Sequence, residues 1–428
     1  MLGAGGLASA SAQSLLELYD AARAYDATYL SARALAESVP YRVDQAAALL
    51  RPSASVGGTA ARVETDPAIG PSYGSNSLSL NLNGRLPLLN RANTVALRQA
   101  EKGLEVARAD LDSAEQDLIL RLSQTYFDVL AAEDTLRTTR TGKAAISEQL
   151  ASARRNFEVG TATITDTREA QARFDLATAE EIAADNELVT RRIALDQLVG
   201  RANVNPRQLA VPVALPALAP TSPDEWVRLA EVQHPLVRRA RTALDVALLE
   251  TERARAAASP TIDAVGSVGT GRGAVGGQAG ALVGTNSSAS FGVQLNMPLY
   301  TGGLVQSRIK ETLVLEDRAR NDLEAARRNV SQATRQAFYN LLSGTARVRA
   351  LEAAESSSQL ALEATQLGYR VGVRVNLDVL NAQNQLFQTR RDLARARYEV
   401  LVGTLRLRQA AGLVTAQDVA AVDRLLVR

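Results

Sequence analysis

The chain has 428 residues, 46% hydrophobic and 22% charged, a balance that lets it bury a core and sets it apart from disordered chains. Lysine and arginine total 48 and aspartate and glutamate 46, so the chain lacks the excess of basic charge that a nucleic-acid partner requires. Without cysteine and with a single histidine, His234, only carboxylates remain as ligands for zinc or haem iron. We therefore expect no nucleic-acid partner, no disulfide, no metal site and no cofactor.

The N-terminus is similar to the end of a secretory signal peptide. Residues 2–12 are small or apolar and end in Ala10-Ser11-Ala12, an A-x-A cleavage pattern, but a basic segment before them is missing. We interpret residues 1–12 as a signal-peptide remnant, and the alternative is an ordinary helix start. Elsewhere no run of about 18 apolar residues occurs, so we expect no transmembrane helix.

Two segments alternate apolar and polar residues with the period of a β-strand. One surrounds Leu78, Leu80 and Leu82, and the other surrounds Phe291 and Val293. A weaker strand pattern precedes each segment, so each pair predicts a hairpin, at about 52–86 and about 260–299. The turn-rich stretches 65–76 and 269–288, the second with seven glycines, are the expected loops.

Long helices are expected after each hairpin. None of the 13 prolines lies in 88–205 or 299–428, and proline breaks helix interiors. Apolar residues recur every seven positions, as in the series Leu97, Leu104, Leu111 and Leu118. A continuous helix over 88–157 would run on the order of 100 Å at 1.5 Å per residue.

The chain contains an internal two-fold repeat. Adding 212 to a residue number maps Phe157-Glu158-Val159-Gly160 onto Tyr369-Arg370-Val371-Gly372, and Asp166 onto Asp378. Two halves of one plan are therefore predicted, each a helix, a β-hairpin and a long helical hairpin. We assign the first repeat to 13–202 with its tip at 157–166, a Pro-rich linker to 203–224, the second repeat to 225–413 with its tip at 369–378, and a C-terminal segment to 414–428.

Four strands with one apolar face fit a membrane barrel, but four strands cannot close one. Open edges are not tolerated in lipid, where each unpaired backbone group costs several kcal/mol. Several chains must therefore combine: two would give eight strands and three would give twelve. Helices of this length then suit a conduit that leads away from the membrane.

The sequence resembles the TolC family of outer-membrane efflux proteins, over about Ser14 to Leu413. The resemblance rests on the duplicated hairpin and helix plan and on the paired tip motifs, each of which is followed by Ala-Gln (Ala170-Gln171 and Ala382-Gln383). It implies a mainly α protein with membrane β-structure: a homotrimer whose 12-stranded β-barrel continues into a long α-helical barrel. It places the protein in the outer membrane of a Gram-negative bacterium, in contact with outer-membrane lipid and extending into the periplasm, with the linker and C-terminal segment forming an equatorial belt.

The resemblance also assigns roles to individual residues. It implies that Thr165 and Asp166 of the first tip and Tyr369 and Arg374 of the second hold the periplasmic end closed. Asp378 matches an acidic ring at the pore entrance that selects cations, and Asn381 stands where a second acid is expected, which weakens that ring. Gly160 and Gly372 match contacts with a periplasmic adaptor (membrane fusion) protein.

From this likeness we expect a channel of a tripartite efflux or type I secretion system that exports small molecules or proteins. Its further partner would be an inner-membrane transporter of the ABC or RND type. The alternative is a non-conducting periplasmic coiled-coil scaffold or adaptor protein. No nucleophile motif or phosphate-binding loop is present, so we do not expect an enzyme.

Overall fold

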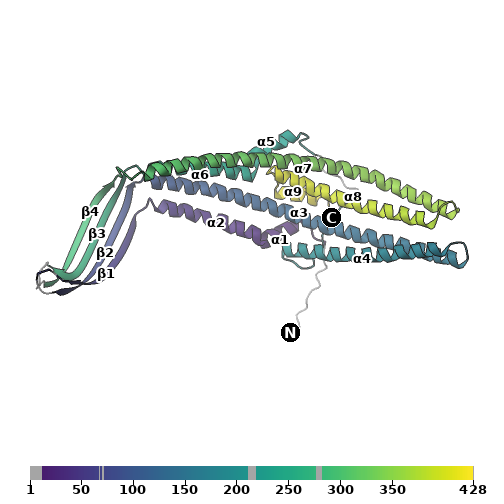
Figure 1. The fold of residues 1–428 in the computed structure, drawn as a ribbon, viewed down its shortest axis with the longest axis horizontal. Helices are drawn as coiled ribbons and strands as arrows, with labels where there is room; N and C mark the ends of the chain where they lie inside the picture. The colour runs from purple at the N-terminus through teal and green to yellow at the C-terminus, as the bar shows by residue number, and fades with distance from the viewer. Residues whose placement is uncertain (1–11, 67, 70–71, 211–217, 276–281, 428) are drawn as a thin grey trace, which may run out of the picture. The chain divides into compact units, whose positions relative to one another are not determined.

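The computed structural model describes residues 12–66, 68–69, 72–210, 218–275 and 282–427 (Figure 1). The expected signal-peptide remnant lies outside these residues except for Ala12. The first half of the chain forms α1 (Leu15–Tyr25), α2 (Ala27–Ala48), β1 (Ser53–Thr65), β2 (Tyr73–Leu89), α3 (Arg91–Glu158) and α4 (Ile164–Val199). The second half forms α5 (Pro223–Gln233), α6 (Pro235–Ala256), β3 (Thr261–Val275), β4 (Leu282–Asn296), α7 (Leu304–Arg370), α8 (Asn376–Ala410) and α9 (Ala416–Asp423).

The order of elements is the same in both halves, with α9 added at the end. The long helices also match in length: α3 has 68 residues and α7 has 67, while α4 has 36 and α8 has 35. A mainly helical chain with four strands is confirmed. The absence of proline explains why α3 runs without interruption.

Contacts divide the chain into two compact units, and each unit takes segments from both halves. Unit 1 comprises Met1–Ala34, Ala109–Arg238 and Ala326–Arg428, and unit 2 comprises Leu35–Arg108 and Arg239–Ala325. The sequence repeats are thus interleaved in space, since a lone hairpin or helix pair cannot bury its apolar face.

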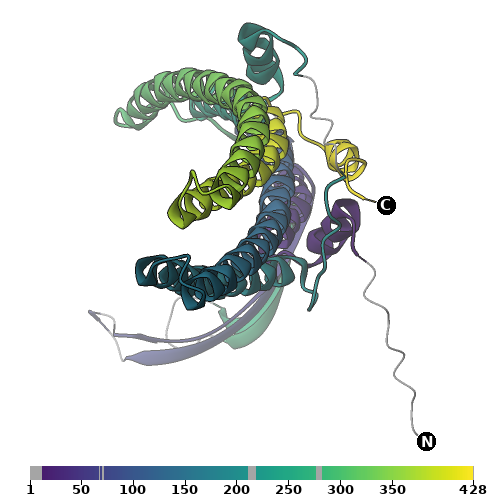
Figure 2. The ribbon, with the colours of Figure 1, turned by 90° about the vertical axis from the view of Figure 1, so that its right-hand side faces the viewer.

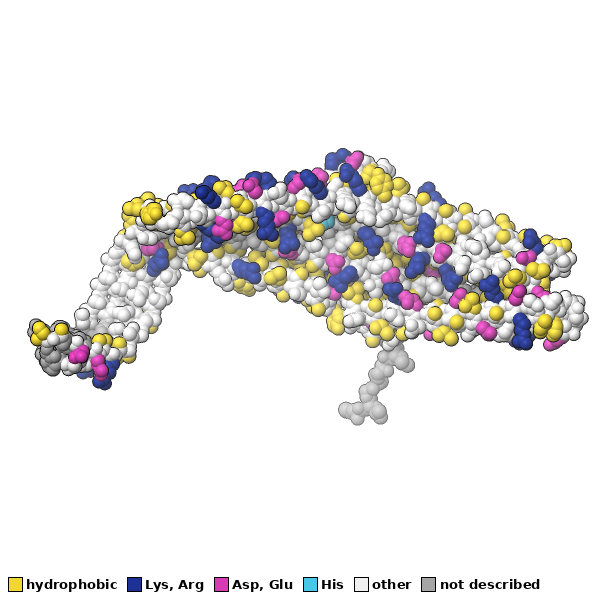
Figure 3. All heavy atoms as spheres, in the orientation of Figure 1, with side chains coloured by type: hydrophobic (Ala, Val, Ile, Leu, Met, Phe, Trp, Pro, Cys, Tyr) yellow, Lys and Arg dark blue, Asp and Glu magenta, His cyan; other side chains and the backbone are white. Residues whose placement is uncertain are grey.

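Unit 2 holds an antiparallel sheet in the order β1-β2-β3-β4, so β1 and β4 are its edge strands. Adjacent rows across the sheet differ sharply in polarity. One row pairs Val56, Leu82, Val268 and Ala289, and the next row pairs Ser55, Asn83, Ser267 and Ser290. Because successive side chains point to opposite faces, the sheet has one apolar and one polar face. The face visible in Figure 3 is mostly white and carries few charges.

The expected loops over 65–76 and 269–288 were too long. β2 already begins at Tyr73, β3 continues to Val275 and β4 begins at Leu282. Glycine is intrinsically a weak strand former, but it is accommodated in these strands where a neighbouring side chain approaches the backbone closely. A Cβ atom at Gly269 would lie 2.3 Å from the Oδ1 atom of Asn81, its partner in β2.

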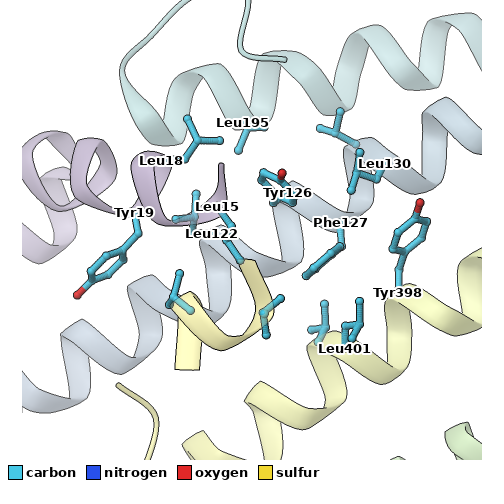
Figure 4. Close-up of a cluster of buried hydrophobic side chains, with 14 of the residues drawn as sticks. Leu15, Leu18, Tyr19, Leu122, Tyr126, Phe127, Leu130, Leu195, Tyr398 and Leu401 are labelled. Atoms are coloured by element: carbon cyan, nitrogen blue, oxygen red, sulfur yellow. The ribbon is translucent and has the colours of Figure 1, made fainter. Parts of the chain in front are cut away.

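The core of unit 1 joins α1, α3, α4 and α8 (Figure 4). Leu18, Leu122 and Leu195 are fully buried at its centre. The rings of Phe127 in α3 and Tyr398 in α8 stack with centroids 5.7 Å apart. The Tyr126 hydroxyl donates a hydrogen bond to the Arg207 carbonyl oxygen (3.0 Å), and burial raises the pKa of this phenol. This core connects the helical hairpin of α3 and α4 with α8 of the second helical hairpin.

His234 ends α5 and packs against the C-terminal end of α8. A Cβ atom at Gly412 would lie 2.4 Å from the His234 Cα atom, which explains glycine at that position. The His234 Nδ1 atom accepts a hydrogen bond from the Leu236 backbone N–H (3.2 Å), and burial lowers the pKa of the imidazole. The histidine is therefore neutral and structural.

Candidate functional site

The two turns that join the long helices have one backbone geometry. In the first turn, the Gly160 N–H donates to the Phe157 carbonyl oxygen (3.0 Å) and the Thr161 N–H donates to that of Asn156 (2.8 Å). In the second turn, the Gly372 N–H donates to Tyr369 (3.1 Å) and the Val373 N–H donates to Gly368 (2.9 Å). Each pair differs by 212 in number, so the sequence repeat holds down to single hydrogen bonds.

Both turns depend on a left-handed glycine. Gly160 has φ of 79° and Gly372 has φ of 81°, a region that side chains with Cβ rarely adopt. A Cβ atom built at either glycine would meet nothing within 4 Å. The backbone at these exposed positions can therefore be approached closely by another molecule.

The first turn is closed by reciprocal hydrogen bonds. The Asp166 N–H donates to the Thr163 Oγ1 atom (3.2 Å), and the Thr163 N–H donates to the Asp166 carboxylate (3.0 Å). This is a capping box, which satisfies two of the unpaired N–H groups at the start of α4. The Asp166 charge also lies near the positive end of the helix dipole.

The second turn has no such hydroxyl, because Val375 precedes α8. The Asp378 carboxylate accepts a longer hydrogen bond from the Val375 N–H (3.4 Å) and faces an Arg374 guanidinium nitrogen at 3.6 Å. Arg374 folds back over Gly368, where a Cβ atom would lie 2.8 Å from the arginine Cγ atom. The arginine is exposed, so its ion pair contributes little, about 0–1 kcal/mol.

Two hydrogen bonds connect the turns to one another within the chain. The Asn156 side-chain amide donates to the Tyr369 hydroxyl (3.3 Å), and the Asn376 amide donates to the Asp166 carbonyl oxygen (3.4 Å). The buried Asn376 side chain also pairs with Gln149 of α3. Tyr369 and Asp166 thus both accept hydrogen bonds from the other hairpin.

Asn381 lies one turn along α8 from Asp378. Its Oδ1 atom accepts a hydrogen bond from the Arg173 guanidinium of α4 (3.0 Å). Where the resemblance leads one to expect a second acid, the chain instead has a neutral amide beside a cation. Asp378 and Asn381 together therefore carry less negative charge than two carboxylates would.

The four expected gate residues are near the turns but not joined to one another in a single chain. Asp166 and Arg374 each engage a neighbour in their own turn, Tyr369 contacts Asn156, and Thr165 is exposed. The family resemblance implies polar links between these residues that hold the hairpins closed. Their role as a gate stays a prediction.

Sequence reasoning missed Asn156, Asn376, Gln149 and Arg173. A signal was available, because these link residues stand where the two repeats differ. Asn156 corresponds to Gly368 and Asn376 corresponds to Ile164 at the same offset of 212. A polar residue in only one copy of a repeat cannot serve the turn geometry that both copies share, which points to a contact between the copies.

The described residues contain no group of three or more histidine, cysteine or acidic side chains placed to hold a metal ion. In this part of the chain, no helix combines the length and apolar composition needed to span a membrane. The turns therefore offer hydrogen bonds, weak ion pairs and accessible backbone.

The family model described as outer membrane efflux protein matches residues 18–201 and 226–413. The outer membrane protein TolC of Vibrio cholerae serotype O1 is 32% identical over 414 residues, which cover 96% of this chain and 93% of that protein. The alkaline protease secretion protein AprF of Pseudomonas aeruginosa is 32% identical over 310 residues, 72% of this chain and 63% of that protein. The crystal structure of the Vibrio cholerae outer membrane protein VceC has a TM-score of 0.77 at 19% identity, covers 93% of this chain and 96% of its own, and shows the same fold.

Proposed function

Since this chain belongs to the outer membrane efflux protein family, we propose that it acts as a homotrimer, the exit duct of a tripartite efflux or type I secretion system. It is an outer-membrane channel protein of a Gram-negative cell that extends into the periplasm, as its relatives are. The family consists of channels and not of enzymes.

The four-stranded sheet is the observation that best supports the proposed trimer. Its edge strands β1 and β4 leave unpaired backbone groups, and its apolar face is exposed, with Leu82 at 50% and Val293 at 66%. In lipid, unpaired backbone must be satisfied by closing the sheet. Two copies would give an eight-stranded barrel filled by side chains, whereas three give twelve strands around a channel.

The turns are the proposed periplasmic gate. Thr165 and Asp166 of one hairpin and Tyr369 and Arg374 of another would hold the closed state through hydrogen bonds and ion pairs. Each such link is weak because salt and water screen it. Threefold repetition adds them to several kcal/mol, which a docking partner can overcome by binding the open state more tightly.

Two further roles are proposed for the same end of the channel. Three copies of Asp378 would attract cations, moderated by the Asn381–Arg173 contact. The open backbone at Gly160 and Gly372 would receive a periplasmic adaptor protein. An inner-membrane transporter of the ABC or RND type would supply the cargo, either small molecules or, as the name of AprF suggests for that relative, a secreted protein.

Two measurements on the detergent-extracted protein test this function. Its mass after correction for bound detergent should equal three chains, and planar bilayers should show stepwise ion conductance. A stable monomer would refute the trimer. A trimer that never conducts, and that fractionates without detergent, would favour the alternative of a periplasmic scaffold.

A further inference from the structure

We propose that the apolar face of the sheet holds a specific binding site for a phosphorylated lipid of the outer leaflet. In this site Arg272 binds the phosphate group, and a groove on the sheet receives an acyl chain. The proposal rests on the outer-membrane barrel proposed above and names one lipid site on its surface. It differs from general contact with lipid because it requires one particular cation and one particular groove.

Arg272 lies toward the end of the sheet that is remote from the helices. The helices α2, α3, α6 and α7 all join the sheet at its other end, next to Ser53, Leu89, Thr261 and Asn296. From there the strands run as one curved sheet toward their hairpin ends (Figure 2). With the helices in the periplasm, the hairpin ends face the outside of the cell, and Arg272 lies on the side of the outer leaflet.

Arg272 is a charged residue on a face that is otherwise mostly apolar. It is aligned with Leu78 in β2 and with Thr285 in β4. Because successive side chains alternate between faces, Arg272 shares its face with Leu80 and Val268. Arg272 is exposed, and within the described ranges no side chain pairs with its guanidinium. An ionisable residue on a membrane-facing surface indicates a functional site, and the partner that a guanidinium requires is an anion.

The level of Arg272 matches the boundary of the hydrocarbon. The apolar face is already present near the helices at Leu295, which is 66% exposed, and β4 continues from there to Thr285 beside Arg272. This stretch of strand covers about 34 Å at about 3.4 Å per residue. A tilt of about 40° reduces its height to roughly 26 Å, close to the apolar band of about 25 Å in outer-membrane barrels. An arginine at that height can extend its guanidinium to the lipid headgroups.

A groove of about 420 Å³ lies on the same face, between Arg272 and the helical end of the sheet. Its part farther from Arg272 is lined by one row of apolar side chains across the four strands: Val56, Leu82, Val268 and Ala289. Its nearer part includes Thr270 and Ser287, whose hydroxyl oxygens lie 3.3 Å apart. The groove therefore gains hydroxyl groups toward the arginine, as a lipid becomes polar from its acyl chain to its headgroup.

The chemistry of the polar end suits a phosphate group. The planar guanidinium of Arg272 can donate two parallel hydrogen bonds to phosphate oxygens. Thr285 is the aligned partner of Arg272 in β4 and carries a hydroxyl that can donate another. A lipid that bears both a phosphate and acyl chains would use the arginine and the groove together, whereas free phosphate would use only the first.

Arg62 in β1 provides the internal comparison. It lies on the same face and near the same level, since it is aligned with Asn76, two residues before Leu78 in β2. Its Nη2 atom, however, lies 3.1 Å from the Glu64 Oε1 atom. Arg62 and Glu64 therefore neutralise each other, and Arg272 is the cation that remains to attract a lipid anion.

Lipid binding to the detergent-extracted trimer tests the site, measured by native mass spectrometry as lipids bound per chain. The probes are diphosphoryl lipid A and phosphatidylcholine, which has acyl chains but no net charge. We expect the parent to bind one lipid A per chain, about tenfold more tightly than phosphatidylcholine. Inorganic phosphate should not displace the bound lipid A, because it cannot occupy the groove.

Two pairs of variants separate the arginine from the groove. Arg272→Gln should weaken lipid A binding about tenfold, whereas the matched control Arg62→Gln should bind like the parent. Arg272→Lys keeps the charge and should retain most of the affinity. Ala289→Phe should fill the groove and weaken binding about tenfold without a change in charge. Its control is Val293→Phe, on the same face of β4 but outside the groove, which should have no effect.

The detergent-corrected mass and the conductance of the same samples separate this site from the proposed function. All variants should remain conducting trimers, because they alter exposed residues of the sheet. A conducting trimer that binds lipid A as tightly as the parent after Arg272→Gln or after Ala289→Phe would overturn the site and leave the channel standing. Equal affinity of the parent for the two lipids, or displacement of lipid A by inorganic phosphate, would overturn it as well. A parent that is monomeric by mass would overturn both the site and the proposed function.

Discussion

The two helix turns share one backbone but differ in what holds them. In the first turn, Thr163 and Asp166 cap α4 by reciprocal hydrogen bonds, and the position equivalent to Arg374 is Ala162. In the second turn, Val375 offers no hydroxyl, and Asp378 is shared between a backbone N–H and Arg374. Duplication thus preserved the geometry that both turns need and left the side chains free to diverge. We expect the first turn to be the rigid member and the second to be the one that moves.

The largest expected effect comes from making the second turn resemble the first. Tyr369→Phe introduces the residue that the first turn has as Phe157, and Arg374→Ser removes the guanidinium. If each copy loses about 1 kcal/mol of closure, three copies lose about 3 kcal/mol, and the ratio of open to closed channels, measured as open probability in planar bilayers, should rise roughly a hundredfold.

Arg374→Ser alone should raise the open probability less, and high salt should partly reproduce this rise because salt screens an exposed ion pair. The matched control is Ala162→Ser in the first turn, which should leave the open probability unchanged. A double variant that conducts like the parent would place the gate elsewhere.

Substitution of either turn glycine, Gly160 or Gly372, should have the same effect, because the two turns share one backbone geometry. Gly160→Ala and Gly372→Ala each force a side chain into the left-handed region, at a cost of about 1–2 kcal/mol. We expect faster amide exchange by roughly tenfold in the altered turn only. Adaptor affinity, measured with the purified adaptor protein, should fall for both variants. A change confined to one glycine would show that the turns are not equivalent in docking.

Removing or adding a capping hydroxyl should affect the two turns differently. Thr163→Ala removes the hydroxyl of the capping box and should weaken the start of α4 by about 1 kcal/mol, seen as roughly fivefold faster amide exchange at residues 164–167. Val375→Thr supplies the missing hydroxyl and should slow exchange at 376–379 by a similar factor. If Val375→Thr has no effect, the second turn is already as rigid as the first, and the comparison fails.

The smallest expected effect concerns ion selectivity. Asp378→Ala removes one carboxylate from each copy and should reduce cation preference by about twofold, measured as the reversal potential under a salt gradient. Asn381→Asp should shift that potential the opposite way, because it adds a charge beside Arg173. An unchanged reversal potential in both variants would refute a selective role for this position.

Much of the fold could be predicted from periodicity alone. Strand alternation around Leu82 and Phe291 and proline-free heptads are local signals, and the offset of 212 is a self-similarity that the sequence shows directly. The structure has strands, long helices and turns at these places. Loop lengths were overestimated, because glycine-rich stretches also form strands when neighbours such as Asn81 pass close by. The links Asn156–Tyr369 and Arg173–Asn381 join residues more than 200 positions apart, and no local pattern encodes such distances.

The sequence by itself determined the two kinds of element, since strand alternation and heptads depend on residues within a few positions of one another, and the repeat, since matching motifs recur at a constant offset of 212. Only the tertiary structure decided which elements become neighbours. It interleaved the two halves in each unit, set β2 beside β3, and brought α3 and α8 together through Phe127 and Tyr398. The physical reason is that burial depends on contacts between segments that lie far apart in the sequence.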